Sequence, residues 1–334
     1  MSGTAGGGPA RIAVIGAGAW GTALAIQAMR AGAETVLWAR DPARAAAMQA
    51  TRENAAHLPG QPLPEGLRVT ADAGEALEGA ALALLVVPSQ HLAGVLAGLP
   101  ALPPSLIAAK GVELGTLRLP LEIVTEMRPG LPAGVLSGPN FAREVAAGLP
   151  AAAVVASTDA RLRETAAGQL STPCFRLYGQ DDPVGVEVGG AAKNVIAIAA
   201  GAVIGAGLGE NARAALVTRG LAEIARLAVA LGGRADTVAG LSGLGDLLLT
   251  CTGGSSRNFS LGLALGQGQR LEDILAARNS VTEGVATAPA MLARAATVGV
   301  EMPITAAVAD VLSGRADVAG AVEQLMTRPR RREV

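Results

Sequence analysis

A single lysine and a single asparagine interrupt a long apolar segment of the chain. Lys193 and Asn194 lie within residues 188–207, where almost every other residue is apolar or glycine. A lysine close to a reacting oxygen can donate a proton and accept it again in the reverse direction. Burial lowers the pKa of a lysine from about 10.4 toward neutral pH, and Asn194 could orient a ligand hydroxyl. The alternative is that Lys193 extends along its helix and places its ammonium group in solvent.

Three glycines near the start of the chain form the pattern G-x-G-x-x-G. Gly16, Gly18 and Gly21 follow an apolar run, residues 11–16, and open a segment with helical character. In this setting the first glycine makes a tight turn, the second lets a pyrophosphate approach the backbone, and the third packs the helix against the strand. The pattern predicts a dinucleotide site at a helix N-terminus. A glycine-rich turn without a ligand is the alternative.

The end of the next predicted strand indicates which dinucleotide binds. NAD-specific domains usually end this strand with a carboxylate for the ribose 2′-hydroxyl. Residues 35–40 end instead with Arg40, and Asp41 follows one position later. Because arginine suits a 2′-phosphate, we expect NADPH/NADP to be preferred and NADH/NAD to serve as well; an exposed strand-end arginine is the alternative. Hydride transfer to a carbonyl would then leave an alkoxide that Lys193 could protonate.

Short apolar runs alternate with helical stretches over the first half of the chain, and long Ala/Leu-rich helices follow. This order predicts an α/β Rossmann-type doubly wound sheet followed by an all-α C-terminal domain. We divide the chain into a flexible N-terminus (1–10), a dinucleotide-binding Rossmann domain (11–187), a helical substrate-binding domain (188–326) and a basic tail (327–334). The expected strands are 11–16, 35–40, 81–88, 105–111, 135–139, 151–157 and 174–179, and the later helices are 189–206, 211–231, 285–298 and 304–312.

Composition excludes several classes of protein. The net charge of −1 gives no basic field for nucleic acid. Two cysteines and two histidines are poor material for a metal site, and free thiols suit a reducing cytoplasm. The first ten residues lack the apolar core of a signal peptide. The glycines and the lysine within residues 188–207 favour a buried helix of a soluble protein over a membrane span.

A series of motifs in a fixed order resembles the bacterial type of NAD(P)-dependent glycerol-3-phosphate dehydrogenase along nearly the whole chain. The family's activity is the interconversion of dihydroxyacetone phosphate and sn-glycerol 3-phosphate, and reduction supplies the backbone of phospholipids. The resemblance implies a homodimer in the cytoplasm, with the active site in the cleft between a Rossmann domain and a helical domain. The motifs are GAGAWGTALA (16–25), KG (110–111), SGPNFAREVAAGLP (137–150), GGAAKNVIAIAAG (189–201), NARAALVTRGLAEIARL (211–227), GLSGLGDLLLTCTGGSSRN (240–258), LGQG (265–268), TEGVATA (282–288) and VEMPI (300–304).

The resemblance also assigns roles around the reacting carbon. It implies that Lys193 is the catalytic proton donor and acceptor, that Lys110 contacts substrate and cofactor from the Rossmann side, and that Asp246 lies beside Lys193. A neighbouring carboxylate would raise the pKa of Lys193, whereas burial would lower it. The sequence leaves open which effect is larger.

Further positions are assigned by the same resemblance. Ser256, Arg257 and Asn258 would bind the substrate phosphate, with Arg257 also near the cofactor. Gly138 and Asn140 would contact the substrate, although the family usually has Ser or Thr where Asn140 stands. The resemblance further implies a cofactor-binding role for Trp20, Ala142, Val281 and Glu283. Plain packing of Trp20 and an exposed loop charge at Arg257 are the alternatives.

Two other functions fit parts of the sequence. One is a related two-domain reductase that acts on a β-hydroxyacid or on ketopantoate, which would also carry a Rossmann domain, helices and a catalytic lysine. The other is a non-catalytic regulator that binds NADPH without turnover. The complete series Lys110, Lys193, Asp246 and Arg257 argues against the regulator, and the GLGDLLLTCT and SRN segments argue against the other reductases.

Overall fold

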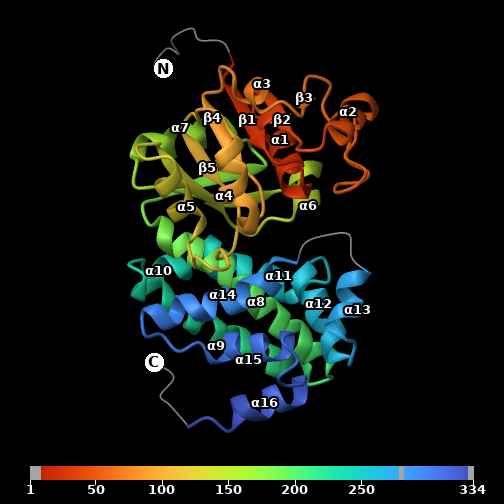
Figure 1. The fold of residues 1–334 in the computed structure, drawn as a ribbon, viewed down its shortest axis with the longest axis vertical. Coiled ribbons are helices and arrows are strands. Elements are labelled where there is room, and N and C mark those ends of the chain that lie inside the picture. Colours follow the sequence, from red (N-terminus) through yellow and green to blue (C-terminus); the bar gives the residue numbers. More distant parts are fainter. Residues whose placement is uncertain (1–8, 278–281, 330–334) are drawn as a thin grey trace. The chain divides into compact units, whose positions relative to one another are not determined.

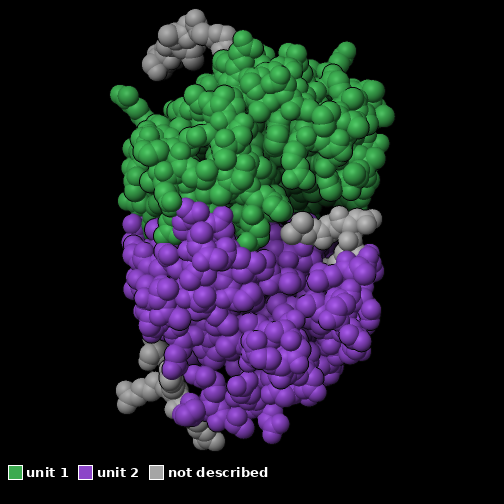
Figure 2. Space-filling model, viewed as in Figure 1, with its two compact units in different colours: residues 1–109, 120–183 green, residues 110–119, 184–334 purple. Residues whose placement is uncertain are grey.

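The computed structural model of the protein describes residues 9–277 and 282–329. The chain divides into two compact units, which Figure 2 colours separately. Unit 1 comprises residues 1–109 and 120–183, and unit 2 comprises residues 110–119 and 184–334. Residues 110–119, expected within the Rossmann domain, therefore group with the helical unit. The reason is packing, because Val112 and Leu119 are buried in the hydrophobic core of unit 2.

Unit 1 is built on an eight-stranded sheet in the order β3-β2-β1-β4-β5-β6-β7-β8. Figure 1 labels the strands β1 to β5. Neighbouring strands are parallel except for the pair β6 and β7. The strand order reverses between β1 and β4, which is the position where doubly wound folds bind nucleotides. The strands are β1 (Arg11–Ile15), β2 (Glu34–Trp38), β3 (Arg68–Thr70), β4 (Leu82–Leu85), β5 (Ser105–Ile107), β6 (Ala133–Ser137), β7 (Ala151–Ala156) and β8 (Phe175–Gln180).

Helices cover both faces of this sheet. Alternate residues of β1 point to opposite faces: Ile12 and Val14 pack with one group of helices, and Ala13 and Ile15 with the other. The first group is α1 (Ala19–Arg30), α2 (Pro42–Thr51), α6 (Ala142–Ala147) and α7 (Ala160–Leu170), and the second is α3 (Ala73–Leu77), α4 (Ser89–Gly98) and α5 (Pro120–Met127). The prediction of an α/β Rossmann-type sheet is confirmed.

Several predicted strands are longer than the observed ones. The expected ranges 35–40, 81–88 and 105–111 overlap β2, β4 and β5, which end earlier because their ladders to neighbouring strands end there. The apolar residues beyond each end continue as buried loops toward the nucleotide-binding edge. The short strand β3 carries too few residues for its alternation to stand out in the sequence, and it was not predicted.

The regular secondary structure in the described part of unit 2 is helical, and residues 110–119 join it as a loop. Its central helix is α8 (Pro183–Gly205), whose residues 185–201 are all buried. A helix of this length and hydropathy could span a membrane, yet 89% of its most apolar window is buried inside the protein. The other elements are α9 (Gly209–Ala230), α10 (Ala235–Val238), the π-helical turn η1 (Leu241–Gly245), α11 (Asp246–Thr252), α12 (Arg257–Gly266), α13 (Leu271–Ala276), α14 (Glu283–Thr297), α15 (Pro303–Leu312) and α16 (Val318–Met326).

Glycines let α8 and α12 approach backbone to backbone. A Cβ added at Gly201 would fall well inside contact distance of the Phe259 carbonyl oxygen, and one added at Gly262 would meet the Ile198 carbonyl oxygen in the same way. The glycines in α8 thus serve packing against a second helix. The close approach also fixes the N-terminal end of α12, where the predicted phosphate-binding residues begin.

We expect Gly262→Ala to destabilise the protein by roughly 3 kcal/mol, because an oversized side chain must push two packed helices apart. Chemical denaturation measures the change. Gly168→Ala in the middle of α7 is the matched control, since a Cβ there meets nothing within 4 Å; it should be neutral or stabilising by up to about 1 kcal/mol. Equal stability of the Gly262→Ala variant and the wild type would contradict this account of the α8–α12 contact.

Candidate active site

Two lysines share one buried carboxylate in unit 2. Lys193 Nζ donates to Asp246 Oδ1 at 2.7 Å, and Lys110 Nζ donates to Asp246 Oδ2 at 2.5 Å. The exposed side-chain fractions are 1% for Asp246, 11% for Lys193 and 17% for Lys110. The sequence contains no other lysine. Both lysines of the protein therefore contact a single carboxylate. The scarcity of lysine is a signal that the sequence alone contains.

A threonine that the sequence reasoning missed completes this group. Lys193 Nζ donates to Thr250 Oγ1 at 2.9 Å, and Thr250 Oγ1 in turn donates to the Asp246 carbonyl oxygen at 2.6 Å. Thr250 lies four residues after Asp246, so one turn of α11 places both on the same face. We call Lys110, Lys193, Asp246 and Thr250 the lysine–aspartate cluster.

Close backbone contact brings α8 and α11 together at this point. Gly189 lies four residues before Lys193, on the same face of α8. A Cβ at Gly189 would come within 3.1 Å of the Gly243 Cα, in the π-helical turn that leads into Asp246. A Cβ at Gly243 would clash with the Val238 carbonyl. Gly189 in α8 and Gly243 in the GLSGLGD segment thus allow the close approach that sets Asp246 opposite Lys193.

The electrostatics of the cluster favour an ionised carboxylate and a lysine that releases its proton readily. Burial lowers the pKa of Lys193, and the neighbouring Lys110 lowers it further, whereas Asp246 opposes both; the net direction is downward. Burial alone would raise the pKa of Asp246, but the two ammonium groups more than offset this and hold it below its usual value. Burial therefore outweighs the carboxylate at Lys193, which answers the question that the sequence left open.

The geometry leaves Lys193 able to act on a ligand. Among the described residues, two of its three N–H donors are taken, one by Asp246 and one by Thr250. The third can donate to a substrate oxygen. The cluster can hold a polarised carbonyl or hydroxyl, add a proton to it or remove one, and offset developing negative charge with the second ammonium group.

A ring of amide hydrogen bonds joins α8, α12 and α14 beside the cluster. Asn258 Nδ2 donates to Asn194 Oδ1 at 2.9 Å, and the Gly284 N–H donates to Asn258 Oδ1 at 3.0 Å. Asn194 Nδ2 donates to Glu283 Oε2 at 3.4 Å. Burial raises the pKa of Glu283, and Arg257 and the two lysines partly offset it. Asn194 and Asn258 are therefore already engaged in ordering the start of α14, and each keeps one further N–H for a ligand.

Ser256 and Arg257 stand at the N-terminus of α12. Ser256 is the N-cap, and its Oγ accepts from the Phe259 N–H at 3.2 Å. Arg257 is exposed at the first helical position. A helix N-terminus with an adjacent guanidinium is a suitable site for an anion.

The two cysteines, both free, differ in their surroundings. Burial raises the pKa of Cys251 to about 12, so its thiol stays neutral beside the lysine–aspartate cluster. Cys174 is exposed. Within the two described stretches of chain, no three His, Cys, Asp or Glu side chains gather as metal ligands.

The glycine-rich loop of unit 1 has the shape that a dinucleotide requires. Gly16 has φ +119°, and a Cβ there would lie 2.5 Å from the Val86 carbonyl oxygen. A Cβ on Gly21 would clash with the Gly16 carbonyl. A Cβ on Gly18 would meet nothing within 4 Å. Packing thus explains Gly16 and Gly21, whereas Gly18 leaves open space over the N-terminus of α1, where a pyrophosphate fits. Trp20 packs against the core of the sheet.

Arg40 and Asp41 differ in what holds them. Arg40 is exposed just beyond β2. Asp41 is the N-cap of α2, and its Oδ1 accepts from the N–H groups of Ala43 and Arg44. The carboxylate nearest to the expected ribose position is thus tied to its own helix.

The remaining predicted positions also lie in unit 1, with one exception. Gly138 has φ +152°, and a Cβ there would lie 2.9 Å from the Ala153 Cα. Asn140 Nδ2 donates to the Ala152 carbonyl at 3.1 Å, so the amide is fixed to β7. Ala142 is the first residue of α6. Val281 lies outside the described residues.

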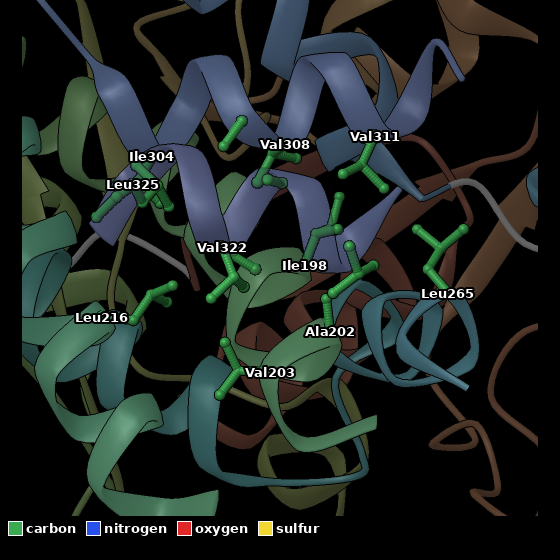
Figure 3. A pocket seen from close by; sticks show the side chains of 14 residues that line it. Ile198, Ala202, Val203, Leu216, Leu265, Ile304, Val308, Val311, Val322 and Leu325 are labelled. Atoms are coloured by element: carbon green, nitrogen blue, oxygen red, sulfur yellow. The ribbon is translucent and has the colours of Figure 1, made fainter. Parts of the chain in front are cut away.

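One cavity in unit 2 has the wrong chemistry for a site of this kind. It has a volume of about 40 Å³ and lies between α8, α9, α12, α15 and α16 (Figure 3). Its fourteen lining side chains are all aliphatic, among them Ile198, Leu216 and Val308. With no polar group to bind a phosphate or move a proton, it is not suited to this chemistry.

Comparison with known proteins points to one family. Residues 11–163 match the family model of the NAD-dependent glycerol-3-phosphate dehydrogenase N-terminus, and residues 182–323 match that of the C-terminus. A relative from Rhodospirillum rubrum, named glycerol-3-phosphate dehydrogenase (NAD(P)+), is 55% identical over 326 residues, which cover 96% of this chain and 93% of the relative. A relative of the same name from Acidiphilium cryptum is 55% identical and covers 96% and 98%.

Solved structures agree with the sequence comparison. The crystal structure of glycerol-3-phosphate dehydrogenase from Coxiella burnetii has a TM-score of 0.90 at 39% identity and covers 96% of this chain and 99% of that one. A ketopantoate reductase structure from Ralstonia eutropha has a TM-score of 0.57 at 17% identity and covers 93% of this chain and 99% of that one. The second likeness extends to the fold alone.

Proposed function

Since the chain belongs to the NAD-dependent glycerol-3-phosphate dehydrogenase family, we propose that it interconverts dihydroxyacetone phosphate and sn-glycerol 3-phosphate with NADP(H) or NAD(H). The observation that carries this proposal is the lysine–aspartate cluster, in which the buried Lys193 keeps one donor for a substrate oxygen. Membership of the family identifies the substrate, and Lys193 of the lysine–aspartate cluster provides the proton.

Lys193 is the general acid of the reduction. Its third N–H hydrogen-bonds the carbonyl oxygen of dihydroxyacetone phosphate and delivers a proton as negative charge develops there. When bound, the reduced nicotinamide cofactor supplies the hydride. Asp246 holds the Lys193 ammonium group in place through Oδ1. Lys110, which is bound to Asp246 Oδ2, stabilises the negative charge that develops on the substrate oxygen. In the oxidation direction, neutral Lys193 removes the hydroxyl proton.

The phosphate end of the substrate belongs at the N-terminus of α12. Arg257 provides a charged fork, and Ser256 and Asn258 provide neutral hydrogen bonds, with Asn258 already oriented by Asn194 and Gly284. Binding energy at this remote group serves to position the reacting carbon.

The direct test is oxidation of NADPH or NADH by dihydroxyacetone phosphate, followed by nicotinamide absorbance. We expect turnover with the phosphorylated ketone and little or none with dihydroxyacetone. Turnover of ketopantoate or a β-ketoacid instead would reassign the substrate. Cofactor binding without turnover of any of these compounds would identify a regulator.

Arg40 carries our proposal that NADPH is the preferred cofactor. We expect Arg40→Ala to weaken NADPH binding about 10-fold or more, because a charge-assisted hydrogen bond to the 2′-phosphate is lost, and to leave NADH binding unchanged. Steady-state KM values for the two cofactors check this. Arg161→Ala is the matched control, since Arg161 is likewise an exposed arginine within two residues of an aspartate that caps a helix. Equal losses for both cofactors would contradict the assignment.

The family resemblance also bears on the oligomeric state, the location and the biosynthetic role of the protein. It supports a homodimer in the cytoplasm that supplies the glycerol backbone of phospholipids. Sedimentation of the purified protein measures the oligomeric state, and a mass equal to that of one chain would contradict the dimer.

A further inference from the structure

Two backbone carbonyls of the glycine-rich loop are held by side chains from three elements. Asn54 Nδ2 donates to the Ala17 carbonyl oxygen at 3.0 Å, and Arg44 Nη2 donates to the same oxygen. Thr22 Oγ1 donates to the Gly18 carbonyl at 2.8 Å and accepts from Asn54 Nδ2 at 2.7 Å. Asn54 follows α2 and is fully buried. None of these contacts was expected from the G-x-G-x-x-G pattern.

The orientation of the Asn54 amide is fixed by its partners. The Ala17 carbonyl can only accept, and the Thr22 hydroxyl proton is already directed at Gly18, so the NH₂ group must face both. Asn54 Oδ1 is buried, and no hydrogen-bond partner for it exists among the described residues. An unsatisfied buried acceptor costs stability. Asn54 therefore donates two hydrogen bonds to the loop region while its own Oδ1 stays buried without a donor in the described part of the chain.

Holding these carbonyls determines where the loop N–H groups point. In a trans peptide the N–H of each residue points opposite to the carbonyl of the residue before it, and the described chain has no cis peptides. With the Ala17 carbonyl turned to Asn54 and Arg44, the Gly18 N–H points the other way. Gly18 is the glycine that leaves open space. Neither Gly18 nor Ala19 donates its N–H within the described residues.

We propose that Asn54 and Arg44 are positioning residues for the cofactor pyrophosphate: by holding the Ala17 carbonyl they aim the Gly18 N–H at it. Through its hydrogen bond to Thr22, which donates to the Gly18 carbonyl, Asn54 also helps to aim the Ala19 N–H. The proposal rests on the cofactor dependence of the proposed function and not on the identity of the substrate. Because the pyrophosphate is common to NADPH and NADH, both cofactors need these residues equally. This separates them from Arg40, which acts on the 2′-phosphate alone.

The test is Asn54→Asp, which keeps the size of the side chain but replaces the donor by a carboxylate that faces the Ala17 carbonyl. Kd values for NADPH and NADH are measured by fluorescence titration, with kcat at saturating cofactor and the Tm alongside. We expect both Kd values to rise about 10- to 100-fold by the same factor, with kcat within about threefold of wild type. Unchanged Kd values would overturn the proposal.

Gln27→Glu is the matched control. Gln27 is also a buried amide, and its Nε2 donates to the Leu170 carbonyl at 3.0 Å and to Thr172 Oγ1 at 3.1 Å, away from the loop. We expect it to lower the Tm without changing either Kd. An equal loss of cofactor binding in Gln27→Glu and Asn54→Asp would show a general effect of destabilisation and would overturn the proposal.

Arg44→Leu independently removes a second donor to the Ala17 carbonyl. It tests the proposal by itself if Asn54→Asp does not fold. Arg44 is only half-buried, so its removal disturbs the core less. We expect both Kd values to rise several-fold together. A loss confined to NADPH would make Arg44 a ligand of the 2′-phosphate and overturn its positioning role. If the wild-type enzyme binds the cofactor normally but does not turn over dihydroxyacetone phosphate, the proposed function is contradicted and the positioning role is not.

Discussion

Lys193→Ala is expected to lower kcat for reduction of dihydroxyacetone phosphate by about 10³-fold or more, while NADPH still binds with a Kd close to that of the wild type. The ammonium group is the acidic proton donor that α8 offers to the substrate carbonyl, and general acid catalysis contributes about 10²- to 10⁴-fold. Cofactor binding should survive because the glycine-rich loop lies in the other unit. Single-turnover rates and fluorescence titration separate the two quantities.

Cys251→Ala is the control for this prediction. Cys251 is buried beside the cluster, but its raised pKa keeps the thiol neutral. We expect kcat within about threefold of the wild type, since no proton or charge is lost. Near-normal turnover of Lys193→Ala would refute the mechanism, and a collapse of activity in Cys251→Ala would show that the helical core, not the lysine, is the sensitive feature.

Asp246→Asn has the second largest expected effect. It leaves two ammonium groups facing a neutral amide, and breaking a buried ion pair by removing one partner costs about 3–5 kcal/mol. Asp246 is also the group that raises the pKa of Lys193 against burial and Lys110. The pKa of Lys193 should therefore fall further in the variant. Because reduction needs the protonated lysine, the decline of rate with rising pH should move to lower pH.

The two lysines make this effect directly visible. Labelling the lysine Cε atoms with ¹³C gives two side-chain signals, which Lys110→Arg and Lys193→Arg assign. We expect the signal of Lys193 to titrate at lower pH in Asp246→Asn than in the wild type, together with a kcat reduced about 100-fold. An unchanged or higher titration midpoint in the variant would contradict the pKa account.

The parts of the fold that local sequence determines were predictable. Short apolar runs identified seven of the strands, and the change to long Ala/Leu-rich helices identified the helical region. The short strand β3 and the early ends of β2 and β5 depend on pairing with neighbouring strands, which local sequence does not encode. The placement of residues 110–119 in unit 2 depends on tertiary packing in the same way.

The site residues likewise divide into those that sequence patterns indicated and those that only the structure shows. The isolated lysine and the glycine pattern indicated their chemistry without a structure, and the family resemblance added Lys110 and Asp246. Thr250 lies within the motif at residues 240–258, but no role was assigned to it; its position one turn after Asp246 is consistent with its contact. Asn54 contacts Ala17 across 37 positions of sequence, and only the folded chain reveals it. Hydrogen bonds between distant elements are the part that sequence patterns leave out.

The pH dependence of hydride transfer in both directions, measured in single turnovers of the wild-type enzyme, shows whether Lys193 exchanges the proton. We expect reduction to slow and oxidation to accelerate as pH rises through one shared pKa, which lies below the usual lysine value of about 10.4. The donor in reduction and the acceptor in oxidation are then the same group. Rates that stay constant with pH in both directions, or two unrelated transitions, would contradict the assignment of Lys193 as the proton donor and acceptor.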